Sequence, residues 1–427
     1  MSKFNVKSLV AIFFLLSGLI NVPIKAQFSV DGDFKVRWYS DSFTQTLDSR
    51  DKENYMRYLG RIRTNFKVSS DISFHSELTT IFENNSNSVR NIVGTGNMYY
   101  TITQLFAELS TQDFLGLDLV RLRAGRQPFS VGSGLSFGES YYYLNKFDGA
   151  RVDAAYAGFT FTLFGAITEQ SLSEDELYPE PGSDQIYAAR LSKEIFNQNV
   201  MGYYLLQRFR GLFNDNQVFG LGITGDFLNE RLDYFGEFAY QKFNTAPGLP
   251  KQHGIGYMGG IGYRFSFGPF RSIKIETRYA AYQGDDPSTG DVEIFSPPYP
   301  SFFWGDRTGY ANSEIGGSYP YNGKNPEGSK IWYSRIYVIP KILPALRIQL
   351  QYINVDEYAD ADGYNSEDDE VSLRFYYTLH TNAQIELRLS KGLPNGEDKD
   401  LNGSGTITSG EDRYSFFRIM GQLQISF

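Results

Sequence analysis

Apolar and polar residues alternate along almost the whole chain, and this pattern restricts the possible folds more than any other feature. In the last segment one parity is apolar: Phe417, Ile419, Gly421, Leu423, Ile425 and Phe427. The other parity is polar apart from Met420: Arg418, Gln422, Gln424 and Ser426. Because side chains two residues apart share one face of a β-strand, this period predicts a strand with an apolar face and a wet face.

About eighteen segments show this alternation, and most are about ten residues or longer, which is enough for a tilted strand to cross a membrane. They cover residues 28–40, 56–69, 71–84, 100–112, 118–127, 147–156, 158–168, 184–195, 200–209, 217–226, 232–243, 254–266, 271–283, 331–340, 345–355, 369–379, 383–391 and 413–427.

The connections between these segments alternate between short and long. Residues 69–71, 157–158 and 196–199 are short connections, whereas 128–146 and 284–330 are long ones. Short turns on one rim and longer loops on the other are typical of outer-membrane barrels. We therefore predict an all-β fold: a transmembrane antiparallel up-and-down β-barrel of about 18 strands, with short periplasmic turns and long extracellular loops.

The beginning of the chain resembles a secretory signal. Lys3 and Lys7 precede the apolar run LVAIFFLLSGLINV, and the small residue Ala26 follows it. A basic region, a short apolar region and a small residue predict a signal peptide over 1–26. A retained helical anchor is the alternative, but the apolar run is short for a membrane span. Residues 27–427 would then form a single barrel domain in the bacterial outer membrane.

Composition excludes several other classes of protein. The chain has no cysteine, so it has neither disulfides nor thiolate sites, and its net charge of −9 argues against a nucleic-acid partner. Its three histidines show no metal-ligand spacing, and no P-loop is present. The glycine-rich stretch GIGYMGGIG (254–262) falls within a strand pattern. We therefore expect no enzymatic activity.

The polar parity of the strands is rich in arginine. The candidate pore-lining residues on it are Arg37, Arg61, Arg63, Arg121, Arg123, Arg151, Arg190, Arg278, Arg374 and Arg388. A pore lined by one sign of charge selects ions of the opposite sign, and the guanidinium fork suits carboxylate and phosphate. The hypothesis is passive diffusion of anionic solutes through an arginine-lined lumen. The alternative is that arginine–acid pairs mainly brace the barrel wall.

Residues 121–152 resemble the alginate-export family of outer-membrane porins. The resemblance rests on RLRAGRQPFSVGSG and NKFDGARV, and specifically on Arg123, Gly125, Arg126, Gln127, Phe147, Asp148, Gly149 and Arg151. It implies transport of a uronate-type oligosaccharide or polysaccharide through a positive constriction, and it adds Arg126 to the candidate pore lining. From the strand pattern itself, the two glycines are interpreted as sites of crowding or bulges.

The insert PFSVGSGLSFGESYYYL (128–144) departs from that family because it is aromatic and has few charges. One interpretation is that it folds inward and offers an aromatic surface to sugar rings. It also faintly resembles phosphate-selective porins, so a general or phosphate-selective porin is one alternative function. A surface structural or adhesive barrel is another, because loop 284–330 is aromatic and rich in proline and glycine.

The stretch DLNGSGTITSGE (400–411) has the spacing of a twelve-residue calcium loop. The predicted ligands are Asp400, Asn402, Ser404, Thr406, Thr408 and Glu411. The loop would connect the last two strands on the extracellular side. The alternative is a solvated hairpin without an ion.

The expected partners follow from the barrel. Its outer face would contact outer-membrane lipid and lipopolysaccharide, and its lumen would contact an anionic solute. The aromatic Phe427 at the end of an alternating strand resembles the signal that the barrel assembly machinery reads.

Overall fold

The computed structural model describes residues 26–44, 50–85, 98–137, 147–168, 185–208, 215–244, 250–285, 288–295, 329–357, 366–395 and 415–427. In this part of the chain, no helix combines the length and the hydropathy that a membrane span requires. The predicted calcium loop at 400–411 and the predicted signal peptide, apart from Ala26, lie outside the described residues.

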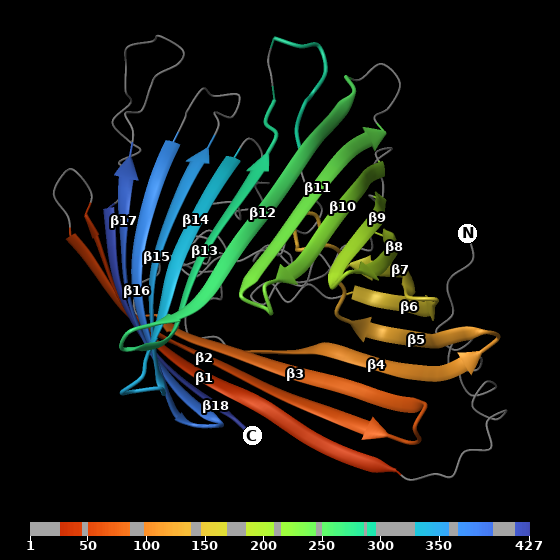
Figure 1. Cartoon of the computed structure of the whole chain (residues 1–427), viewed down its shortest axis with the longest axis horizontal. Coiled ribbons are helices and arrows are strands. Elements are labelled where there is room, and N and C mark those ends of the chain that lie inside the picture. Colours follow the sequence, from red (N-terminus) through yellow and green to blue (C-terminus); the bar gives the residue numbers. More distant parts are fainter. Residues whose placement is uncertain are drawn as a thin grey trace.

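The described residues form one antiparallel sheet of 18 strands (Figure 1). The strands are β1 (Gln27–Thr44), β2 (Arg50–Lys67), β3 (Ile72–Asn85), β4 (Met98–Phe114), β5 (Leu117–Gln127), β6 (Phe147–Tyr156), β7 (Phe159–Thr168), β8 (Gln185–Ile195), β9 (Gln198–Arg208), β10 (Asp215–Phe227), β11 (Leu232–Asn244), β12 (Gln252–Phe267), β13 (Phe270–Tyr282), β14 (Ser329–Pro340), β15 (Leu346–Glu357), β16 (Ser366–His380), β17 (Ala383–Asn395) and β18 (Ser415–Ser426). Each predicted segment corresponds to one of them, so the predicted fold is confirmed.

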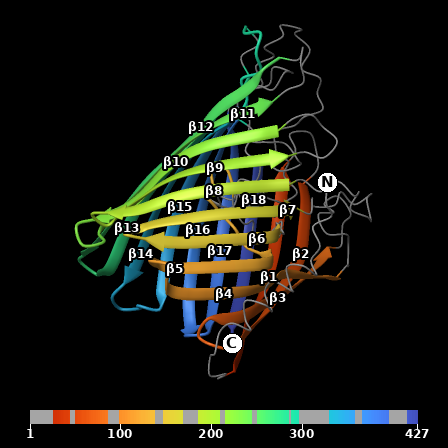
Figure 2. The same ribbon diagram turned by 90° about the vertical axis from the view of Figure 1, so that its right-hand side faces the viewer.

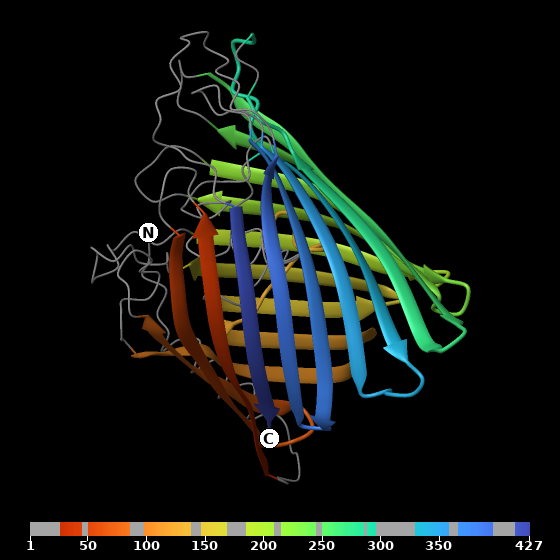
Figure 3. The ribbon, with the colours of Figure 1, turned by 90° about the vertical axis from the view of Figure 1, so that its left-hand side faces the viewer.

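The sheet closes on itself. Every strand pairs with its neighbours in the sequence, as Figure 2 shows for β4 to β10, and β1 pairs with both β2 and β18. Figure 3 shows this seam, with β1 beside β18. At its end, Phe427 and Gly32 exchange two backbone hydrogen bonds of 3.0 Å. Closure satisfies the backbone groups that a sheet edge would leave unpaired in lipid.

Tight hairpins join the strands on one rim, which we call the turn rim. The two-residue turns Ala157–Gly158 and Phe196–Asn197 have positive φ at both positions, the backbone of a type I′ hairpin turn. The C-terminal end of β18 lies at the same rim (Figure 3). The opposite rim, the loop rim, carries the longer connections. In porins the turn rim faces the periplasm.

The outer face of the barrel is apolar. Large side chains of one parity are exposed around it, among them Trp38, Ile62, Leu78, Leu163, Leu191, Leu221, Ile275, Ile336, Leu350, Leu387 and Leu423. A closed sheet with an apolar outer belt is one of the two structures that can span a bilayer. The protein is therefore a barrel of the bacterial outer membrane, and the last strand directs its apolar parity at lipid.

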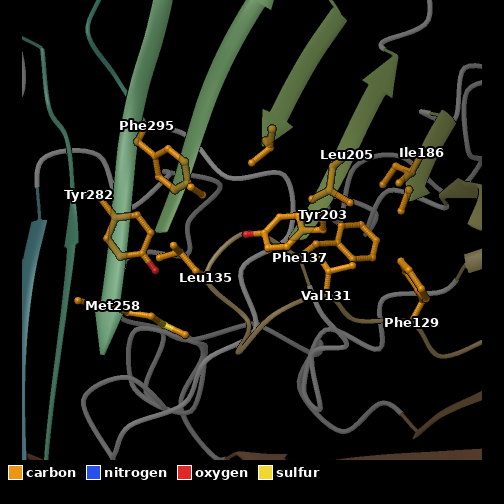
Figure 4. Packing of buried hydrophobic residues seen from close by; sticks show 14 of the residues in the cluster. Phe129, Val131, Leu135, Phe137, Ile186, Tyr203, Leu205, Met258, Tyr282 and Phe295 are labelled. Atoms are coloured by element: carbon orange, nitrogen blue, oxygen red, sulfur yellow. The ribbon is translucent and has the colours of Figure 1, made fainter. Parts of the chain in front are cut away.

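The inside of the barrel contains an apolar cluster, which we call the inner cluster (Figure 4). Its larger members are Phe129, Val131, Leu135, Phe137, Phe147, Phe164, Ile186, Tyr203, Leu205, Met258, Tyr282 and Phe295. Residues 128–137 of the insert thus fold inward and pack against the wall, as one interpretation of the sequence expected. Residues 138–144 of the insert lie outside the described residues.

Candidate functional site

Arginines on the inner face of β1–β6 are bound to acidic neighbours. Arg63 lies at the centre, with ion pairs of 2.8 Å to Asp31, 2.6 Å to Asp33 and 2.8 Å to Glu77. Arg61 forms a second ion pair with Asp33 at 3.1 Å. Because the strand register brings these groups together across three strands, this part of the wall fits the bracing interpretation.

The bracing continues along β4–β6. Glu108 accepts ion pairs from Arg123 at 2.5 Å and from Arg121 at 3.5 Å. Arg151 pairs with Asp153 at 2.8 Å, although it lies directly opposite Arg123 in the register of β5 and β6. Like charges in directly opposed positions repel each other, so each of these two arginines depends on its own carboxylate.

Arg190 on β8 differs from these residues. It donates a hydrogen bond of 3.3 Å to the hydroxyl of Thr162, and among the described residues it has no ion pair. It is half-buried on the inner face, and Arg151 lies close enough to repel it. Asp153 also lies near Arg190 but forms its ion pair with Arg151, so Arg190 adds positive charge to the lumen.

The opposite wall carries one inward-facing arginine on each of seven consecutive strands, from β13 through β18 to β1. We call this set the arginine row: Arg278, Arg335, Arg347, Arg374, Arg388, Arg418 and Arg37. In the described part of the chain, Glu276 binds Arg278 at 2.5 Å and Arg335 at 2.9 Å, and Glu386 binds Arg388 at 2.9 Å.

Tyrosine side chains support the arginine row. The Arg335 guanidinium carbon lies 5.3 Å from the Tyr333 ring centroid and 4.5 Å from that of Tyr337. The guanidinium carbon of Arg418 lies 4.8 Å from the centroid of Tyr39. A ring face attracts a guanidinium without adding a negative charge. These contacts therefore orient the guanidiniums and add no opposing charge of their own.

Arg347 shows this arrangement most clearly. Its guanidinium carbon lies 4.1 Å from the Tyr376 ring centroid and 5.8 Å from that of Tyr337. Within the described part of the chain it has no carboxylate partner, and its buried Nε has no hydrogen-bond acceptor. Arg374 lies beside it and donates a 3.5 Å hydrogen bond to the Tyr376 hydroxyl. The guanidiniums of Arg347 and Arg374 thus both contact Tyr376. Two neighbouring positive groups of this kind suit the binding of an anionic group.

Arg126 is not part of the lumen, so the pore-lining role implied by the family resemblance is wrong for this residue. It shares the outward parity of β5 with Leu122, forms an ion pair of 2.7 Å with Asp148 and donates to the Ile102 carbonyl at 3.1 Å. Its neighbour Gln127 is the buried, inward residue. Strand alternation forces Arg126 to the outside, and its position at the loop end of β5 lets the charge reach the membrane interface.

Arg208 also faces outward, beside Tyr187. On β9 the inward parity is Met201, Tyr203, Leu205 and Gln207, which is mostly apolar because residues 128–137 pack there. Both parities of this strand are apolar in sequence, so alternation did not identify its inner face. The supporting tyrosines of the arginine row were missed for a related reason, since tyrosine is common on both faces.

The remaining sequence expectations concern metal ions, glycines and histidine. The described residues contain no group of three or more His, Asp or Glu side chains arranged for a metal ion, and the predicted calcium ligands lie outside them.

The stretch GIGYMGGIG forms part of β12, as expected. A Cβ on its Gly256 would collide with Phe295 of the inner cluster. His75 stacks on Phe106 inside the barrel, with its Nε2 2.9 Å from the Ser73 hydroxyl.

Replacing Arg63 by leucine is expected to destabilise the barrel. Asp33 and Glu77 are nearly buried, at 6% and 7% exposure; Glu77 would lose its arginine and Asp33 would lose one of its two arginines. Breaking a buried ion pair costs about 3–5 kcal/mol, and the partial exposure of Arg63 reduces this to roughly 1–3 kcal/mol. Urea titration of the folded barrel, followed by tryptophan fluorescence, measures the effect.

The matched control for Arg63 is Arg208→Leu. Its ion pair with Asp215 is 3.8 Å long and solvent-exposed, so its loss should cost at most about 1 kcal/mol. Equal urea midpoints for the two variants would contradict a bracing role for Arg63.

Comparison with known proteins supports the fold. No family model matches the chain, and no curated protein matches it. Among solved structures of Pseudomonas aeruginosa, OccK9 (OpdG) aligns over 94% of this chain and 99% of its own, with a TM-score of 0.56 and 12% identity. OccK2 (OpdF), solved in complex with glucuronate, aligns over 93% and 98%, with a TM-score of 0.54 and 11% identity.

OpdK, an outer-membrane protein solved with vanillate, aligns over 93% of this chain and 99% of its own, with a TM-score of 0.54 and 10% identity. At such identities the likeness concerns the fold. The comparisons give no support to the alginate-export family. The chain has the fold of an outer-membrane β-barrel porin.

Proposed function

We propose that this protein is a passive channel for small anionic solutes that carry a carboxylate. The observation that supports this most strongly is the arginine row, in which Arg347 is held by two tyrosine rings and by no described acid. Guanidiniums that remain charged and keep free donors favour carboxylates, which accept two parallel hydrogen bonds. Two porins of similar fold were solved with glucuronate and with vanillate, both of which carry a carboxylate.

The wall formed by β1–β6 and the wall that carries the arginine row would have different roles. On β1–β6 most inward arginines are committed to carboxylates of the wall and stabilise it. On β14–β16, Arg335, Arg347 and Arg374 are supported by tyrosines, so a solute carboxylate could pass from one of these guanidiniums to the next. Several weak sites in series allow a solute both to enter and to leave, which conduction requires.

Several finer expectations belong to this proposal. A uronate-type saccharide is one candidate solute, because tyrosine rings beside arginines also suit a sugar ring. We infer that the protein is not an enzyme, that its outer face contacts lipopolysaccharide, and that Phe427 takes part in recognition by the assembly machinery. Calcium binding by 400–411 stays a prediction. A purely structural or adhesive barrel is the alternative, and absence of conductance would favour it.

Two measurements test the anion channel. In a planar bilayer with a potassium chloride gradient, the reversal potential should have the sign of chloride preference, and a cation preference would contradict the proposal. In liposome swelling, glucuronate should enter faster than glucose or glucosamine, which are matched in size but neutral and cationic. Equal rates for the three sugars would instead indicate a general porin.

A further inference from the structure

Residues 128–137, which we call the inner segment, cross a large part of the inner wall. At one end Phe129 stacks on Phe164 of β7, with ring centroids 4.0 Å apart. Phe137 packs on Phe147 of β6 at 4.8 Å. In Figure 4, Leu135 lies on the side of Tyr203 that faces Tyr282 and Phe295, and all of these residues belong to the inner cluster. The inner segment is therefore packed against strands from both halves of the barrel.

A carboxylate of the wall holds the tip of the inner segment. Glu237 on β11 is 4% exposed and accepts hydrogen bonds from the backbone N–H groups of Ser133 and Leu135. The Tyr203 hydroxyl donates a third bond to it at 2.6 Å. Ser136 completes the arrangement, because its hydroxyl lies 2.9 Å from the Tyr203 oxygen. Successive backbone N–H groups of a tight turn are a good binding site for an anion.

The turn is built to allow this contact. Gly132 has a positive φ of 63°, and a Cβ at this position would collide with the Glu237 carboxylate. Only glycine combines this backbone with such a close approach. The sequence VGSG at 131–134 is thus matched to a carboxylate located about a hundred residues later in the chain.

Glu237 has an unusual environment among the inward-facing acids. Within the described part of the chain it has no ion pair, so the N–H groups of the inner segment and the Tyr203 hydroxyl alone stabilise its charge. A buried carboxylate without such bonds is strongly unfavourable. If the inner segment moved away, Glu237 would face the water of the lumen and add a negative charge to the wall.

We propose that Glu237 is the residue that positions the inner segment across the lumen, and that the inner segment in turn masks its charge. Displacement of the segment then has two coupled effects: it widens the channel, and it weakens anion preference by unmasking a carboxylate. This inference rests on the proposed channel function for its electrical readout, whereas the contact itself is testable without conductance.

Glu237→Gln keeps the shape of the side chain and removes the charge that the N–H groups bind. Hydrogen bonds to a charged group contribute enough that their loss should raise the population of the displaced state roughly ten- to a hundredfold. Single-channel recordings should show more frequent visits to a larger conductance level. Heat-modifiable migration in gels verifies that the barrel is folded.

The control is Gln241→Ala on the same strand and the same face. Gln241 is also buried and donates a 2.8 Å hydrogen bond to Asn216, which is not part of the inner segment. Its loss should leave the frequency of the larger level unchanged. A folded Glu237→Gln barrel that behaves like this control would overturn the proposal.

Cysteine labelling tests the contact independently of transport, because the chain has no cysteine of its own. Ser136→Cys places a thiol at a fully buried position of the inner segment. A water-soluble thiol reagent should label it roughly ten- to a hundredfold faster when Glu237→Gln is also present. Unchanged labelling would overturn the positioning role even if the protein proved not to conduct anions.

Tyr203→Phe separates the two parts of the proposal. It removes one bond to the carboxylate but keeps the charge of Glu237. Its larger conductance level should show weaker anion preference than the corresponding level of Glu237→Gln. Equal preference in the two variants would overturn the masking of charge, and this outcome is independent of which solute the channel normally carries.

Discussion

Replacing Gly125 by alanine should leave most of the protein unable to form a stable barrel. Gly125 has a φ of 123°, which residues with a side chain rarely adopt, and such strain costs about 1–3 kcal/mol. A Cβ would in addition lie 2.9 Å from the Phe106 Cα and closer still to the Leu105 carbonyl oxygen. Because these contacts are with the backbone of β4, they would be relieved only by shifting the β4–β5 pairing.

The measurement is the fraction of heat-modifiable barrel after refolding into detergent, together with its urea midpoint. Gly421→Ala is the control, because a Cβ at that position would have no atom within 4 Å. It should refold like the natural chain. Equal yields for the two variants would show that the β4–β5 pairing has more freedom than its register indicates.

Neutralising Arg347 and Arg374 together, as Arg347→Gln/Arg374→Gln, should largely abolish anion preference. One unit charge contributes about 1 kcal/mol at 4 Å in water, so two should lower the anion-to-cation permeability ratio roughly ten- to thirtyfold at low salt. The effect should decrease as salt screens the charges. Reversal potentials at two ionic strengths measure both effects.

Arg126→Gln is the matched control for the arginine row, since it removes the same charged group from the outer face. Its reversal potential should equal that of the natural protein. If Arg126→Gln changed the selectivity as much as the double variant, the assignment of inner and outer faces on β5 would be wrong.

The strands of this protein were predictable from its sequence because the cause of the pattern is local. Each membrane-spanning strand has lipid on one side, so every second residue must be apolar wherever the strand lies in the barrel. The same alternation showed that Arg126 has the parity of Leu122, opposite to Arg121 and Arg123. Here the pattern was a better guide than the family resemblance.

Alternation was less informative on those strands of β6–β12 whose inner face is largely apolar, such as β9. The inner segment packs there, so Leu205 is inside and Leu221 outside with little difference in character. A packed interior and lipid select the same side chains, and the periodicity of one strand does not distinguish between them.

The sequence alone therefore determined the number of strands, their approximate limits and the basic character of one face, because these depend on residues two positions apart. Only the tertiary structure decided what each arginine does. Arg63 meets Glu77 and Arg347 meets Tyr376 across strand pairs, and register sets these encounters. The tertiary structure also brings the Glu237 carboxylate to the backbone N–H of Ser133. Such contacts join distant parts of the chain, and no local pattern encodes the distance between them.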